Sequence, residues 1–234
     1  LNLLFKIKSM YLIGLLFILF FVLPKFWLSY TMNRYDKDLS KMPFNAKEFG
    51  ELILKENNLI EVQIEETNLV DHYDLNDSAV RVKTGRLSKK SITSLSIVCH
   101  EIGHAIQHKE KYGPLAQRTN IVEKTMWISR IGGGVLYTAL PLIIATGSFG
   151  LIKICLLFVL ISVLIGVLIH LITLNVEIDA SFNRAMPILK EKIPEQYHNQ
   201  CQSILRAAAF TYVIGALTSF LSLRYVRLIL SRIR

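Results

Sequence analysis

Uncharged runs alternate along the chain with stretches in which polar and apolar residues are mixed. Residues 131–152 form an uncharged run of 22 and residues 154–176 one of 23, and each is long enough to cross the hydrocarbon core of a bilayer. Residues 207–223 form a shorter run of 17, and an apolar run near the N-terminus predicts a first span over about 9–29. Residues 146–150 predict a turn. The pattern therefore predicts four transmembrane helices, of which the second and third form a hairpin.

The mixed stretch of residues 31–125 predicts a water-exposed domain with helix and strand. Residues 46–57 have helical periodicity. Apolar residues then alternate with polar ones on both sides of the turn DLNDS, which predicts a two-stranded ribbon over about 60–84. A further helix follows, and Ser88 or Ser91 is expected to cap it.

A second polar stretch, residues 177–206, follows the predicted hairpin and is expected to be helical. With four spans, the two polar stretches fall on the same side of the membrane. A partner for any functional group in the first stretch is therefore sought in the second.

The composition agrees with a membrane protein, because 52% of the residues are hydrophobic and the net charge is +9. The tails and the hairpin loop carry bases without acids: Lys6, Lys8, Lys153, Arg224, Arg227, Arg232 and Arg234. Bases beside apolar segments are typical of topology signals and of lipid contacts, so we expect a lipid bilayer as partner and no nucleic acid. They favour cytoplasmic ends in the cell membrane and an extracytoplasmic polar domain, whereas four bases near the first span favour the reverse.

The sequence HEIGH, residues 100–104, carries the candidate chemistry. His100 and His104 are four positions apart, so on a helix they lie about 6 Å apart and both imidazoles can reach one zinc ion. Two neutral imidazoles leave such an ion able to act as a Lewis acid. Glu101 projects beside the ion without binding it and is expected to act as the general base. Three protein ligands are typical of a catalytic site, so a third is needed from elsewhere in the chain.

Several residues are candidates for the third ligand. His108 continues the spacing of four, but on a straight helix it lies about 12 Å from His100 along the axis, too far for the same ion. Glu123 has the spacing at which a following antiparallel helix offers a carboxylate. Glu177 directly follows an uncharged run of 23 residues, where a charged side chain is unfavourable unless it has a function. We favour Glu177 over Glu123. Weaker candidates are His170, Asp179 and His198.

Five blocks of sequence point to a known family: VDHYD (70–74), AVRV (79–82), CHEIGHAIQH with YGPLAQR (99–118), TLNVEIDAS (173–181) and AAAFTYV (207–213). In these blocks the chain resembles the YugP-like family of membrane neutral zinc metallopeptidases. The resemblance implies a multi-pass membrane protease whose motif histidines bind zinc, and it places the family's glutamate at Glu177. Asn175 departs from the family pattern, in which a proline is expected.

The first block also draws attention to His72 and Tyr73. A catalytic zinc site usually needs a hydrogen-bond donor for the oxyanion that forms during hydrolysis, and either side chain can donate. A turn at a strand end, in which Asp71 and Asp74 accept backbone amides, explains the same block.

The sequence thus predicts a mainly α, four-span integral membrane protein with a small α+β, zincin-like metallopeptidase domain. The expected parts are a first transmembrane helix (1–30), a domain with the HEIGH helix (31–125), a transmembrane hairpin (126–176), a polar helical segment with the third zinc ligand (177–206), and a last transmembrane helix with a basic tail (207–234).

The expected activity is zinc-dependent endopeptidase activity on a protein or peptide substrate associated with the membrane. One zinc ion per chain is held by His100, His104 and Glu177, and Glu101 is the base. The alternative is a non-catalytic zinc-binding membrane scaffold, in which another ligand such as His72 or His108 closes the site.

Overall fold

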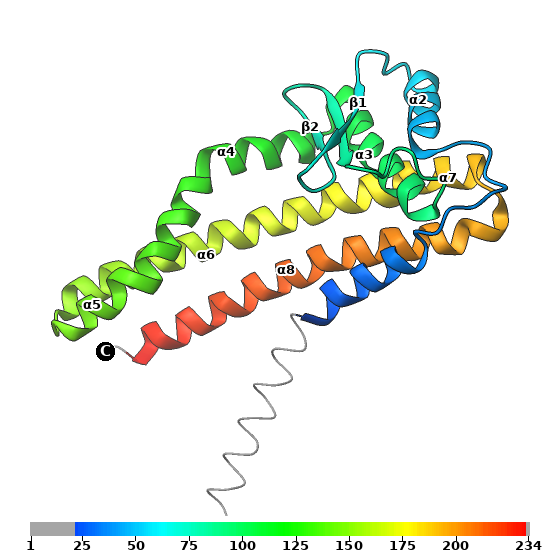
Figure 1. Cartoon of the computed structure of the whole chain (residues 1–234). Helices are drawn as coiled ribbons and strands as arrows, with labels where there is room; N and C mark the ends of the chain where they lie inside the picture. Colours follow the sequence, from blue (N-terminus) through cyan, green and yellow to red (C-terminus); the bar gives the residue numbers. More distant parts are fainter. Residues whose placement is uncertain (1–21, 233–234) are drawn as a thin grey trace, which may run out of the picture. The chain divides into compact units, whose positions relative to one another are not determined.

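The computed structural model describes residues 22–232, which are mainly helical (Figure 1). Residues 22–34 are helical and precede the first labelled element. In chain order the elements are α2 (Ala46–Glu56), β1 (Gln63–Thr67), β2 (His72–Asp74), β3 (Ala79–Lys83), α3 (Ile92–Lys109), α4 (Gly113–Gly134), the π-helical η1 (Val135–Ala139), α5 (Leu140–Ala145), α6 (Phe149–Ile178), the π-helical η2 (Asp179–Ala185), α7 (Met186–Lys192), the 3-10 helix η3 (Glu195–Tyr197) and α8 (His198–Arg232).

The described chain forms two compact units. The first contains residues 22–106 and 179–214, and the second contains residues 107–178 and 215–232. Each boundary falls within helical residues.

The first unit contains a three-stranded sheet with the order β1-β3-β2. Strand β1 is parallel to β3, whereas β2 is antiparallel to it. The expected two-stranded ribbon over 60–84 is therefore wrong, because the short β2 folds back against β3 as a third strand. Asp74 ends β2 by accepting hydrogen bonds from the backbone amides of Asn76 at 2.9 Å and Asp77 at 3.3 Å.

Arg81 anchors the sheet from its central strand. Its guanidinium pairs with Glu65 of β1 at 3.2 Å, with Asp77 at 2.5 Å and with Asp74 of β2. The hydrogen bonds from Arg81 to the carboxylates of Asp77 and Glu65 raise the pKa of Arg81 above its usual value. The backbone amide of Asn76, assisted by Arg81, lowers the pKa of Asp74.

Local capping explains where two helices of the first unit begin. Asn45 and Glu48 form a reciprocal capping box, which confirms the helix predicted over 46–57. The Ser91 hydroxyl accepts a hydrogen bond from the backbone amide of Ser94 at 3.1 Å, so Ser91 rather than Ser88 caps α3.

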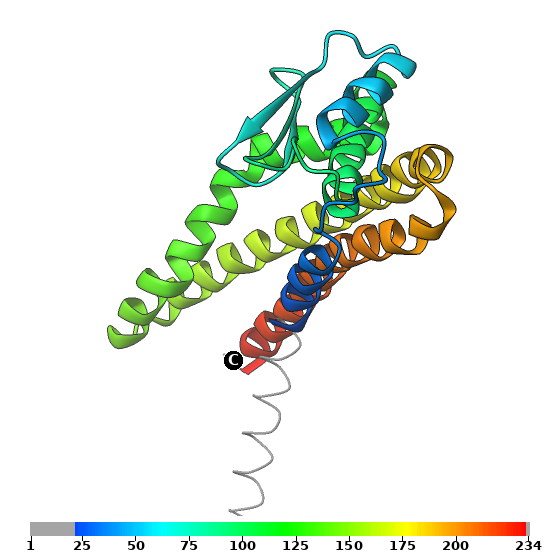
Figure 2. The same cartoon turned by 45° about the vertical axis from the view of Figure 1, so that its right-hand side comes forward.

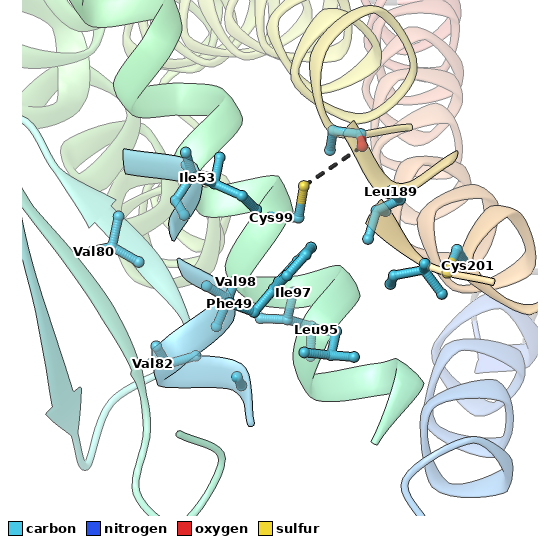
Figure 3. Close-up of a cluster of buried hydrophobic side chains, with 14 of the residues drawn as sticks. Phe49, Ile53, Val80, Val82, Leu95, Ile97, Val98, Cys99, Leu189 and Cys201 are labelled. Atoms are coloured by element: carbon cyan, nitrogen blue, oxygen red, sulfur yellow. Dashed lines mark hydrogen bonds between the residues drawn. The ribbon is translucent and has the colours of Figure 1, made fainter. Parts of the chain in front are cut away.

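Helix α3 lies beside α2 (Figure 2), and its side chains lie in the middle of the apolar core of the first unit (Figure 3). Val98 packs toward Phe49 of α2 and Val80 of β3, whereas Cys99 lies on the side of Leu189 and Cys201 (Figure 3). The Cys99 thiol donates to the Ala185 carbonyl at 3.5 Å, and burial raises the pKa of this thiol. Cys99 is therefore a packing residue that stays protonated at neutral pH.

The second unit is built on the antiparallel helices α4 and α6. The Ser162 hydroxyl of α6 donates to the Ile128 carbonyl of α4 at 3.3 Å. The turn predicted at 146–150 is present, since α5 ends at Ala145, Gly147 has a φ of 68°, and α6 begins at Phe149.

The expected four-span architecture is wrong. Within residues 22–232, one helical segment, Gly150–Lys192, is long and apolar enough to cross a membrane, and only 17% of its most apolar stretch is buried. The run 131–152 is not one helix, because α5 ends at Ala145 and α6 begins only at Phe149. The run 207–223 has 17 residues, at the short end of what crosses a bilayer. Most of the expected first span, 9–29, lies outside the described residues.

Candidate metal centre

The two histidines of HEIGH lie side by side on α3. Their ring centroids are 4.8 Å apart, with an angle of 79° between the ring planes. The spacing of four positions puts both rings on one face of the helix. His104 is 7% exposed, and His100 is half-buried.

Glu177, near the C-terminal end of α6, completes a three-residue group with these histidines. One ligand atom from each of His100, His104 and Glu177 lies within 4.8 Å of the other two. Glu177 is 4% exposed. Two imidazoles and one carboxylate are a donor set of catalytic zinc sites, so these residues fit a zinc ion.

A glycine inside the motif brings α3 close to η2. A Cβ added at Gly103 would lie 2.8 Å from the Ala180 carbonyl oxygen, which is shorter than real Cβ contacts. The backbone of η2 therefore approaches the HEIGH helix at the one motif position without a side chain. Ala180 is three positions after Glu177 along the chain, so the close approach involves the helical segment that directly follows the candidate carboxylate ligand.

Ser181 of η2 contacts His100 directly. Its hydroxyl lies 3.1 Å from Nδ1 of His100, and Ser181 is only 1% exposed. When Nδ1 carries the proton, it donates to the Ser181 oxygen, and Nε2 is the nitrogen that would bind a metal.

Glu101 is the next residue of α3 after His100 and is 7% exposed. One position along an α-helix is a rotation of about 100° and a rise of 1.5 Å. Its carboxylate therefore starts beside the histidine ligands, on a buried part of the same helix.

The other residues considered as the third ligand have different surroundings. Glu123 is exposed on α4, and His108 is exposed in the last turn of α3. The His170 ring packs against Gly215 of α8, where an added Cβ would lie 3.1 Å from it. Asp179 accepts hydrogen bonds from Arg184 at 2.6 Å and Asn183 at 2.9 Å. Nε2 of His198 lies 2.8 Å from the Ile193 carbonyl.

His72 and Tyr73 lie in β2 and are half-buried. Nδ1 of His72 lies 2.8 Å from the Val70 carbonyl, and burial raises the pKa of Tyr73, so its phenol is protonated at neutral pH. Asp71 accepts a hydrogen bond from the Lys83 amide at 2.7 Å. The carboxylates of the DHYD block thus accept backbone amides, as the strand-end turn predicts.

Four residues around the group have no role in the sequence-based prediction: Gly103, Gln107, Arg118 and Ser181. Each lies in one of the blocks that resemble the YugP-like family. Ser181 follows Glu177 by four positions, a spacing that puts two residues on one helix face and could have drawn attention to it.

Comparison with known proteins places the chain in a family. The sequence profile described as "Putative neutral zinc metallopeptidase" matches residues 10–231. The chain belongs to this family. A relative from Bacillus subtilis (strain 168), named "Putative membrane protease YugP", is 33% identical over 219 residues, which cover 88% of this chain and 92% of the relative. No solved structure matches the chain significantly.

Membership in this zinc metallopeptidase family confirms the resemblance found in the sequence. It implies zinc as the metal, and the structure supplies His100, His104 and Glu177 as the candidate ligands. The relative's name and one sufficiently apolar helix both point to a membrane location.

Proposed function

We propose that this protein is a membrane-anchored zinc endopeptidase in which His100, His104 and Glu177 hold one zinc ion and Glu101 is the general base. The grouping of the three ligand atoms within 4.8 Å carries the proposal. The two histidines are neighbours on one helix, but Glu177 follows His104 by 73 positions. Spacing along a single helix therefore does not explain why all three side chains lie together.

When bound, a zinc ion supplies a Lewis acid that polarises a carbonyl and brings the pKa of a water molecule toward neutrality. The Glu101 carboxylate accepts a proton from the attacking water and then gives it to the nitrogen of the leaving amine. Ser181 holds the His100 ring through Nδ1. The low exposure of Glu101 and Glu177 keeps bulk water from both carboxylates.

The scaffold alternative requires a fourth protein ligand. Within residues 22–232, the group contains three side chains of the types that bind metals, which favours a fourth position for water or substrate. Nδ1 of His72 is engaged with the Val70 carbonyl, and His108 lies on the exposed end of α3. Catalysis is therefore the better-supported function.

The proposed substrate is an extended stretch of a membrane-associated protein or peptide. Strands β1 and β2 are the two edges of the sheet, and an extended peptide can pair with an edge strand through its backbone. His72 and Tyr73, on the β2 edge, are the proposed donors to the carbonyl oxygen of the scissile bond. Helix α6 is the proposed membrane anchor.

Substitution Glu101→Gln tests the mechanism. Because Gln keeps the size of the side chain but does not accept the proton, we expect about one zinc ion per chain and a loss of 10²-fold or more in cleavage of a generic unfolded substrate. Zinc content by atomic absorption and cleavage by gel or fluorescence would be measured on the same sample. Cleavage at the wild-type rate would exclude Glu101 as the base.

A further inference from the structure

Gln107, in the last turns of α3, reaches the backbone beside Glu177. Its Nε2 donates to the carbonyl oxygen of Val176 at 2.9 Å, and Gln107 is fully buried. The helix changes from α to π at Asp179, and carbonyls near such a change need partners outside the regular helical pattern. Gln107 gives the Val176 carbonyl such a partner.

Arg118, in the second turn of α4, reaches the carboxylate of Glu177 itself. Its Nη1 lies 3.8 Å from Oε1 of Glu177. The glutamate side chain is 5% exposed and the arginine side chain 35%, so the carboxylate is buried whereas the guanidinium stays partly in water. A carboxylate of this low exposure needs a compensating positive group, and the guanidinium of Arg118 is close enough to supply one.

We infer that Gln107 and Arg118 are positioning residues for the third zinc ligand: Gln107 holds the backbone of α6 beside Glu177, and Arg118 orients its carboxylate. This inference rests on the proposed function, since it takes Glu177 to be a ligand. Gln107 is three positions after His104, so the helix that carries two ligands also fixes the backbone next to the third. The flexible Glu177 side chain is thereby ordered before a metal binds, which strengthens binding.

An ion pair that only balances the charge of Glu177 would compete with a cation for the carboxylate, so its loss would leave zinc affinity unchanged or raise it. The two roles are therefore separated by measuring zinc affinity, with a chromophoric chelator as competitor, on the full chain in detergent micelles. The informative variants are Arg118→Gln and Gln107→Met, which remove the charge and the donor with little change in side-chain length.

Matched controls lie on α4. Arg130→Gln removes an exposed arginine whose Nη2 lies 3.5 Å from Met126 Sδ, and Gln117→Met changes an exposed glutamine. We expect each informative variant to bind zinc about 10- to 100-fold more weakly than the wild type, the usual effect of losing a group that holds a ligand. We expect the controls to stay within about twofold, and Arg118→Lys to recover part of the affinity.

A double-mutant cycle tests whether Arg118 acts through Glu177. In a Glu177→Ala background, residual zinc binding by the two histidines should not change when Arg118→Gln is added. If Arg118→Gln lowers zinc affinity equally in the wild-type and Glu177→Ala backgrounds, Arg118 does not act through Glu177. Circular dichroism and size-exclusion profiles establish that the variants fold, and if Gln107→Met does not fold, Arg118→Gln decides.

The outcomes separate the two proposals. If the wild-type chain binds no zinc, the proposed function fails and this inference fails with it. If the wild type binds zinc and Glu101→Gln abolishes cleavage, but Arg118→Gln binds zinc as tightly as the wild type, only the inference is overturned.

Discussion

The hydroxyl of Ser181 lies 3.1 Å from Nδ1 of His100, although the two residues are 81 positions apart. This contact joins the HEIGH helix to the π-helical segment just after Glu177. When Nδ1 carries the proton, this contact leaves Nε2 of His100 as the nitrogen that would bind a metal, and it limits rotation of the ring.

Removal of this hydroxyl should weaken zinc binding. We expect Ser181→Ala to lower zinc affinity about 10-fold or more, with a thermal unfolding temperature close to that of the wild type, because the His100 ring loses the group that orients it. Competition with a chelator measures the affinity. Ser203→Ala, which removes a hydroxyl that donates within α8, is the control. Equal zinc affinity of wild type and Ser181→Ala would show that Ser181 does not orient the ligand.

Zinc content should distinguish the two candidate glutamates. Glu177→Ala removes one of the three candidate ligands, so we expect the purified variant to retain well under half of the about one zinc ion per chain expected for the wild type. Glu123→Ala changes an exposed side chain and should keep its zinc. Atomic absorption on dialysed protein gives the answer, and loss of zinc in Glu123→Ala alone would reverse the assignment.

A methyl group at position 103 should disturb the site through the backbone. Gly103→Ala puts a Cβ 2.8 Å from the Ala180 carbonyl, so α3 and η2 must move apart. We expect a loss of about 1–3 kcal/mol in the free energy of unfolding, together with weaker zinc binding. At Gly113 an added Cβ meets nothing within 4 Å, so Gly113→Ala is the matched control. Chemical unfolding of both variants would be compared, and wild-type stability of Gly103→Ala would contradict the close approach.

Acid should weaken the sheet through Asp74. The backbone amide of Asn76, with help from Arg81, lowers the pKa of Asp74 in the folded state. A lowered pKa stabilises the fold above the unfolded value of about 3.9, and this stabilisation is lost as the pH falls through the folded pKa. Asp74→Asn should therefore be less stable than the wild type at pH 7, and the difference should shrink toward pH 3.

Urea unfolding at the two pH values measures this effect. Glu51→Gln is the control, because its ion pair with Lys47 spans 3.9 Å between largely exposed side chains and contributes little. A difference between Asp74→Asn and wild type that stays constant from pH 7 to pH 3 would show that titration of Asp74 does not contribute to stability.

Short-range patterns in the sequence predicted local structure well. The helical periodicity of residues 46–57 and the capping signal at Ser91 depend on interactions within a few residues, and the structure has both helices. The spacing of His100 and His104 likewise predicted their common face. Glu177 was favoured by the unfavourable placement of a charge after an apolar run, and it is the carboxylate that joins the histidines.

These local patterns did not predict which distant segments pair or contact each other in the fold. Nothing local in HYD predicts that three residues pair with β3 as a third strand, because pairing partners depend on how the chain folds back. The count of spans failed for a related reason, since an uncharged run shows composition and does not show where a helix breaks. Gly103 and Ser181 were missed because their importance lies in contacts with distant residues.

The grouping of His104 with Glu177 also has a consequence for folding. A zinc ion bound there links chain positions that are 73 residues apart, and a link across a long loop removes conformational entropy from the unfolded chain. Because the unfolded chain does not present the assembled ligands, zinc at 100 times its dissociation constant would stabilise the native state by about 2.7 kcal/mol. The metal would then act as a reversible cross-link, and its removal by a chelator would lower the melting temperature as well as stop cleavage.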